Sequence, residues 1–217
     1  AVRGPLTAGA IEERLAGVPV FALSNSDGEF VMVTGVGSGQ SLGLLCFKEG
    51  DAEALLEQLR SVPLGATGSP GSKVVPLALN KVLQLKVDGV AFRLIPESTQ
   101  VKHALEITEK AGASDYGFTG VPVFQSRSLV LRSQDKSYRP MFFRKEDLDR
   151  SVREASEQLG KLNPAMKEGD TQVAVFEEVI KAMKEGSNST WNDVVFIPPG
   201  FNVYTSDSNP GEVARNR

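Results

Sequence analysis

The sequence has almost no residues suited to disulfide bonding or to soft-metal binding. Its 217 residues include a single cysteine, Cys46, and a single histidine, His103. One cysteine cannot form an intrachain disulfide, and one residue of each kind cannot supply the roughly four ligands of a Cys/His structural zinc site. We therefore expect no disulfide framework and no metal site.

A strong charge of either sign and long apolar segments are also missing. The 24 Lys and Arg against 27 Asp and Glu give a formal net charge of -3. Nucleic acids and anionic membranes are bound through basic patches, so we expect no nucleic-acid partner and at most peripheral membrane association. The longest apolar runs, at 42–47 and 121–124, are far shorter than the roughly 20 residues of a membrane-spanning helix.

No motif of a catalytic or cofactor-binding site is complete. The glycine-rich stretch Gly35–Gly39 lacks the Gly-Lys-Ser/Thr ending of a phosphate-binding loop and leads into a predicted strand, which favours a hairpin connection. His103 lies in a predicted helix without a nucleophile motif, and Cys46 lies in an apolar run typical of a core strand. Acidic pairs such as Glu146 and Asp147 stand at expected helix starts, where the helix dipole explains them. The sequence predicts neither enzymatic activity nor a cofactor.

The sequence does contain an internal repeat. Gly-Val-Pro-Val-Phe occurs at 17–21 and again at 120–124. Two further pairs of blocks follow in the same order: 44–51 matches 140–147, and 90–96 matches 194–198. Such self-similarity indicates a tandem duplication. We expect an N-terminal extension at 1–9, α/β repeats at 10–98 and 99–200 that pack as one globular unit, and a flexible tail at 201–217.

Each repeat predicts the same order of elements. A helix, at 11–16 or 99–110, precedes a strand that begins with Val-Pro-Val-Phe, since proline belongs at a strand start or edge. Two more strands lead into a helix whose apolar residues recur at helical spacing, from Ala52 to Leu59 or from Leu148 to Leu159. Short connections make the first three strands antiparallel. The predicted class is α+β: two halves related by a pseudo-two-fold, each a small, mainly antiparallel sheet with helices on one face.

Six blocks of the sequence resemble one known family. They are GVPVFALSN (17–25), SLGLLCFKEGDAEALL (41–56), VVPLALNKVLQLKVDGVAFRLIPESTQVK (74–102), GVPVFQS (120–126), RPMFFRKEDL (139–148) and WNDVVFIPPG (191–200). Together they are similar to the twenty-two-kilodalton subunit family of the chloroplast inner-envelope translocon, the Tic complex. The resemblance is to the higher-plant branch in its mature form, and it covers about residues 11–200.

This resemblance implies a function in protein import. It implies a non-enzymatic factor of the chloroplast envelope intermembrane space, soluble or peripheral to the inner envelope membrane. Its expected partners are unfolded preproteins, bound as by a chaperone, and the outer and inner translocon subunits. The alternative is a scaffold that joins the two translocons through one fixed interface. A chaperone would bind many unfolded chains, whereas a scaffold would bind one partner.

The strands also predict where clients would bind. Consecutive side chains of a strand point to opposite faces, so strands such as 139–143 are apolar on both faces. Either the two halves bury each other's sheets, or an apolar groove remains for extended precursor segments. The residues predicted for that client-binding surface are Phe21, Phe124, Phe142 and Phe143.

Overall fold

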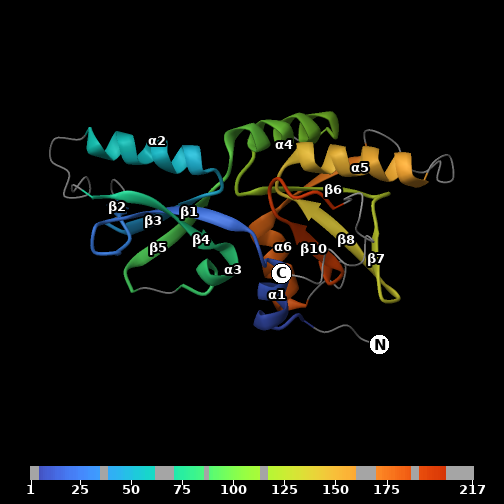
Figure 1. The fold of residues 1–217 in the computed structure, drawn as a ribbon, viewed down its shortest axis with the longest axis horizontal. Helices are drawn as coiled ribbons and strands as arrows, with labels where there is room; N and C mark the ends of the chain where they lie inside the picture. Colours follow the sequence, from blue (N-terminus) through green and yellow to red (C-terminus); the bar gives the residue numbers. More distant parts are fainter. Residues whose placement is uncertain are drawn as a thin grey trace. The chain divides into compact units, whose positions relative to one another are not determined.

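A computed structural model describes residues 5–34, 39–61, 71–85, 88–112, 117–159, 170–186 and 191–203. They belong to two compact units (Figure 1). The inserted unit is Pro19–Glu97, and the split unit combines Ala1–Val18 with Ser98–Arg217. The chain therefore leaves the split unit after Val18 and returns to it at Ser98. Residues 35–38 of the predicted glycine-rich hairpin and residues 204–217 of the expected tail lie outside the described residues.

The described helices and strands follow the order expected from the repeat. The inserted unit contains β1 (Pro19–Ser24), β2 (Met32–Thr34), β3 (Ser41–Cys46), α2 (Glu49–Arg60), β4 (Lys73–Ala78), α3 (Leu79–Val82) and β5 (Val90–Ile95). The split unit contains α1 (Ala8–Arg14), α4 (Ser98–Lys110), β6 (Pro122–Ser126), β7 (Leu131–Ser133), β8 (Lys136–Phe142), α5 (Lys145–Leu159), β9 (Thr171–Val175), α6 (Phe176–Glu185) and β10 (Val194–Ile197). The predicted α+β class with two sheets is confirmed.

The two five-stranded sheets share one topology. In the inserted unit, β1 is antiparallel to β3 and β4, β2 is antiparallel to β3, and β5 runs parallel to β3. In the split unit, β6 is antiparallel to β8 and β9, β7 is antiparallel to β8, and β10 runs parallel to β8. The antiparallel pairing of the first three strands is confirmed. The last strand of each sheet can run parallel to its partner because two helices and a further strand lie between them and provide a long crossover.

The register of the two sheets agrees residue by residue. One row of paired residues consists of Phe21, Cys46 and Ile95 in the inserted unit and of Phe124, Phe142 and Ile197 in the split unit. The repeated Val-Pro-Val-Phe segments thus occupy equivalent strands. This equivalence supports the tandem duplication, and it assigns each position of one sheet a counterpart in the other.

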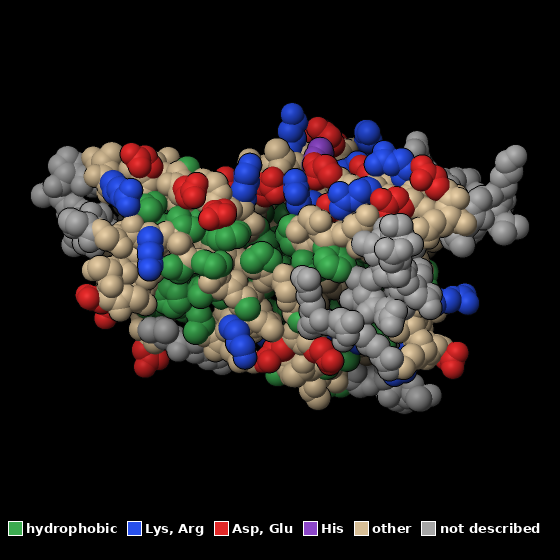
Figure 2. Space-filling model, in the orientation of Figure 1, with side chains coloured by type: hydrophobic (Ala, Val, Ile, Leu, Met, Phe, Trp, Pro, Cys, Tyr) green, Lys and Arg blue, Asp and Glu red, His purple; other side chains and the backbone are tan. Residues whose placement is uncertain are grey.

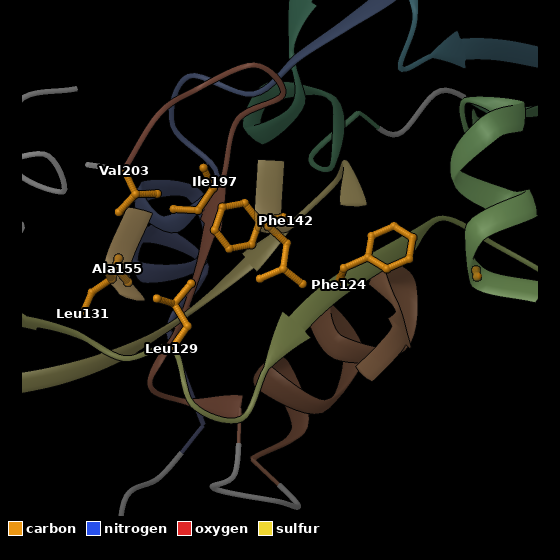
Figure 3. Close-up of a cluster of buried hydrophobic side chains, with 9 residues drawn as sticks. Phe124, Leu129, Leu131, Phe142, Ala155, Ile197 and Val203 are labelled. Carbon is orange, nitrogen blue, oxygen red and sulfur yellow. The ribbon is translucent and has the colours of Figure 1, made fainter. Parts of the chain in front are cut away.

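The split unit buries both faces of its sheet. On one face, Phe124, Phe142 and Ile197 pack with Ala104 of α4 and with Leu148 and Ala155 of α5 (Figure 3). That core extends to Val203, which is 1% exposed and lies within the segment expected to be a tail.

The other face of this sheet holds an aromatic cluster. Phe143 lies 5.4 Å from the ring of Phe176 in α6 and 5.8 Å from that of Phe196 in β10, measured between ring centroids. Figure 1 shows α4 and α5 on one side of β6 and β8 and α6 on the other. The expectation of helices on one face is therefore wrong for the split unit, whose apolar strands are covered from both sides.

Helix α1 packs in the split unit rather than with the repeat that it begins. It starts at Ala8, inside the segment expected to be an extension, because the Thr7 side chain accepts a hydrogen bond from the Ala10 N–H as an N-cap. Arg14 at its end donates from Nη1 to the carbonyls of Asn192 and Val194, each at 2.6 Å. The first sequence repeat and the inserted unit therefore differ by this helix.

Candidate functional site

Three of the four phenylalanines predicted to bind clients are buried in the core of the split unit. Phe124 and Phe142 are 0% exposed and Phe143 is 4% exposed. The fourth, Phe21, is half-buried against the core beneath α2. The expectation that Phe124, Phe142 and Phe143 form an accessible apolar surface is corrected for a simple reason: helices cover both faces of their sheet.

The sheet of the inserted unit has a different covering. Helix α2 packs against one face through Ala52 and Leu56, which contact Leu23 and Cys46. Strand neighbours of these sheet residues must point the opposite way. Residues paired across neighbouring strands point to the same side of the sheet, so the register identifies the residues of this opposite side on the other strands. We call this side the far face. The far face includes Val20, Ala22, Gly43, Leu45, Val75, Leu77, Phe92 and Leu94.

The duplication shows what the far face lacks. At the corresponding place in the split unit, α6 has 10 residues and buries Phe176, Val179, Ile180 and Met183. In the inserted unit, the helix after β4 is α3, which has 4 residues and buries only Leu79 and Val82. A single turn covers less of a sheet than nearly three turns do. In the described part of the inserted unit, no helix therefore lies above part of the far face.

The burial of side chains follows this difference at Phe92 and Leu94, whose counterparts Val194 and Phe196 in the split unit are 0% and 4% exposed. Val20, Ala22 and Leu45 are at most 1% exposed. Four further apolar side chains of the far face are only half-buried: Val75, Leu77, Phe92 and Leu94. Figure 2 shows hydrophobic side chains gathered over the strands of the inserted unit. These four residues are the candidate binding surface.

Phe92 is held in a defined position on this surface. Its ring lies over Gly43, where an added Cβ would lie 2.7 Å from the Phe92 Cδ1 atom. The Phe30 ring meets it edge-on, with centroids 5.9 Å apart and an interplanar angle of 76°. Aromatic pairs favour this geometry. A glycine in the middle of a strand here allows the ring to lie against the backbone.

A groove of about 840 Å³ in the split unit is a weaker candidate. It lies between α4 and α5, with Ile107 and Val152 among its apolar lining residues. Its charged lining residues include both signs, and Lys145 is already paired with Asp149 at 2.7 Å. This mixed lining selects neither an anion nor a cation, nor does it offer the apolar surface that unfolded chains require.

The single histidine and the single cysteine have structural surroundings. His103 Nε2 lies 2.9 Å from the Glu146 carboxylate, which also accepts a hydrogen bond from Gln100 at 2.8 Å. Cys46 is 2% exposed, and burial, with a smaller effect of Asp51, raises the pKa of its thiol to about 11. The thiol is therefore protonated at neutral pH and is a poor nucleophile.

Within the described ranges, no group of three or more His, Cys, Asp or Glu side chains is arranged to hold a metal ion. None of the helices described is both long and apolar enough to cross a membrane.

The fold and this surface define a class: a duplicated α+β protein with one sheet enclosed by helices and one sheet that the described helices of its own unit cover only in part. Comparison with known proteins identifies the family. The chain belongs to the Tic22-like family, which matches residues 1–209. The resemblance found in the sequence is thereby confirmed.

Two curated plant relatives are similar over nearly the whole chain. The chain is 63% identical over 203 residues to the Protein TIC 22-like, chloroplastic, of Arabidopsis thaliana, covering 94% of this chain and 64% of that protein. It is 42% identical over 196 residues to the Protein TIC 22, chloroplastic, of Pisum sativum, covering 90% of this chain and 75% of that protein. The chain thus spans less than two thirds of the Arabidopsis relative.

Two solved structures share the fold. Anabaena Tic22, assigned to protein transport, superposes with a TM-score of 0.67 at 21% identity and covers 90% of this chain and 94% of its own. Tic22 from Plasmodium falciparum gives a TM-score of 0.64 at 21% identity and covers 87% and 91% respectively.

Sequence reasoning missed the residues of the far face. It selected phenylalanines from the repeated blocks, and those blocks form the core of the split unit. A usable signal was present where the repeats differ. The helical stripe from Phe176 to Met183 has only the short segment Leu79–Leu85 as its counterpart. A shorter helix over an equally apolar sheet indicates a face that is incompletely covered.

Proposed function

We propose that this chain is a non-enzymatic protein-import factor that binds unfolded preproteins. It acts in the intermembrane space of the chloroplast envelope, between the outer and inner translocons, in the manner of a chaperone. One observation carries this proposal: on the far face of the inserted unit Phe92 and Leu94 are half-buried, whereas their counterparts in the split unit, Val194 and Phe196, are 0% and 4% exposed. The chloroplastic relatives and the protein-transport assignment of Anabaena Tic22 support the setting.

The chemistry of the far face suits clients of many sequences. Apolar contact contributes roughly 25 cal/mol per Å² of buried area without requiring a fixed arrangement of polar groups. Binding through it is therefore weak, broad and little affected by salt, unlike a charge-steered interface. A scaffold would instead bind one translocon partner at fixed stoichiometry.

The test is suppression of aggregation of an unrelated unfolded protein. Val75→Ser removes an apolar group from the far face, and Val130→Ser is its matched control, since Val130 of the split unit is 42% exposed and lies outside that face. We expect wild type and Val130→Ser to suppress aggregation equally at 50 and 500 mM salt, and Val75→Ser to suppress it less. Circular dichroism melts check that both variants are folded.

Two results would contradict the proposal. Failure of the wild type to suppress aggregation would leave the scaffold as the better account. Equal activity of Val75→Ser and wild type would exclude the far face as the binding surface. Crosslinking of the chain to a precursor arrested during import tests the same function in organelles.

A further inference from the structure

The last strand of each sheet, β5 or β10, has an outer edge that does not face the rest of the sheet. The two outer edges differ in their hydrogen bonding. Just before β10, the Arg139 N–H donates to the Asp193 carbonyl at 2.9 Å, so this carbonyl points toward β8. Successive carbonyls of a strand alternate in direction. Those of Asn192 and Val194 therefore point away from the sheet, and both are bound by Arg14. Helix α1 thus occupies the outer edge of β10.

Among the residues described, none caps the equivalent edge of β5 in this way. The Phe47 N–H donates to the Ile95 carbonyl at 3.0 Å, so the main-chain groups of Ile95 point toward β3. Alternation directs those of Phe92 and Leu94 to the outer edge, and Phe92 is the counterpart of Val194. Within the parts of the chain that the structure describes, β5 pairs only with β3, and no backbone group bonds to that outer edge.

The side chains beside this edge specify what would pair with it. Phe92 and Leu94 lie on the far face and are half-buried, while Arg93 points to the other side and is exposed. A strand added next to β5 would place alternate side chains against the two apolar residues. The intervening side chains would lie near the Arg93 guanidinium.

We propose that the outer edge of β5 binds an extended segment of a client by strand addition, with main-chain hydrogen bonds to Phe92 and Leu94. The preferred segment has apolar side chains at alternate positions and a carboxylate opposite Arg93. This inference rests on the proposed function and names its binding mode. Main-chain pairing recognises any extended polypeptide, and side-chain pockets add preference. Self-pairing of two copies is disfavoured because Arg93 would lie opposite or diagonal to its own copy.

Amide exchange measured residue by residue tests the main-chain bonds. In the free protein, we expect the Phe92 and Leu94 amides to exchange much faster than those of Arg93 and Ile95, which face β3. The probe is an acetylated nine-residue peptide, Thr-Val-Thr-Val-Glu-Val-Thr-Val-Thr. Its addition should slow exchange at Phe92 and Leu94 at least tenfold. Unchanged exchange at saturating peptide overturns the inference.

Modified peptides test pairing without altering the protein. N-methylation of the valines and N-methylation of the other residues each block one edge of the peptide. One of these two peptides should bind at least tenfold more weakly than the parent, and the other should bind like it. If both methylated peptides bind as tightly as the parent peptide, main-chain hydrogen bonds do not contribute, and the proposal is overturned.

Charge reversal tests the register. Arg93→Glu should weaken binding of the glutamate peptide about two- to fivefold and strengthen binding of a lysine-centred peptide to a similar degree. Arg132→Glu, at an exposed arginine of β7, has the same net charge and should change neither affinity. Equal effects of the two variants would reject a role for Arg93.

The two proposals fail in different ways. Normal suppression of aggregation, without protection of the Phe92 and Leu94 amides, refutes strand addition and leaves the proposed function standing. Loss of aggregation suppression in the wild type itself refutes the proposed function.

Discussion

Replacing Gly43 by alanine should destabilise the inserted unit, although alanine usually stabilises a strand relative to glycine. The new Cβ would lie 2.7 and 2.8 Å from the Cδ1 and Cε1 atoms of Phe92. Ordinary carbon–carbon contacts are about 3.5–4.0 Å, so the ring must move by about 1 Å. The neighbouring Phe30 ring, 5.9 Å away between centroids, restricts that movement.

The expected magnitude is the difference between two effects. Overpacking costs about 1–3 kcal/mol, and the gain from replacing glycine within a strand is roughly 0.5–1 kcal/mol. The free energy of unfolding should therefore fall by about 1–2 kcal/mol, which lowers the Tm by roughly 2–8 °C for a chain of this size. Far-UV circular dichroism is the appropriate signal, since the only tryptophan, Trp191, lies in the split unit.

Two controls separate this clash from other effects. In a Phe92→Ala background, Gly43→Ala should be neutral or stabilising, because the atoms that it meets are gone. Gly9→Ala in α1, where a Cβ would have no atom within 4 Å, should be stabilising. A Gly43→Ala protein that melts at or above the wild-type temperature would show that the Phe92 ring does not lie on the strand, and the described far face would be wrong.

Two further predictions concern ionisable groups. The pKa of Cys46 is raised from 9.0 to about 11 in the folded chain, so unfolding between these two pH values releases a proton. The free energy of unfolding should therefore decrease as the pH rises through that window. Urea titrations at several pH values measure this dependence, and Cys46→Ala should remove it. Gln100 is 2% exposed, donates to Glu146 and accepts from the first N–H of α5, so Gln100→Ala should cost about 1 kcal/mol. Burial tends to raise the pKa of Glu146, but hydrogen bonds from Gln100 and His103 outweigh it and lower the pKa; this contribution is present above the ordinary carboxyl pKa and is lost as the pH falls through the lowered value. Acid unfolding that is equally steep in wild type and Gln100→Ala would contradict this role.

The duplication and most strands could be predicted from the sequence because they depend on local signals. The strands Val90–Ile95 and Val194–Ile197 lie in the third pair of repeated blocks, and each is a short, mainly apolar run that begins after polar residues and ends at a proline. Helix α1 was expected at 11–16 but spans Ala8–Arg14. Thr7 is an N-cap that the apolar pattern alone did not reveal.

The placement of α1 and the covering of each sheet could not be predicted in the same way. Both depend on contacts between residues far apart in the chain, such as Arg14 with Asn192. The apolar alternation of β8 is the same whether α6 or a client covers its second face. In the sequence, the difference in covering is indicated by the length of the helix after β4 or β9, whereas the repeated blocks are similar in both halves.

The connection of α1 to the split unit has a consequence for the order of folding. A chain that emerges with its N-terminus first presents Pro19–Glu97 as a complete unit while α1 still lacks the strand that it caps. The Arg14 side chain reaches backbone carbonyls 178 and 180 positions later, so its bonds form only after nearly all of the described chain has been made. Contacts of such long sequence separation form slowly, because a large loop must close before they contribute. Completion of the split unit is thus a late event that depends on β10, and until then Arg14 lacks the carbonyls that it binds.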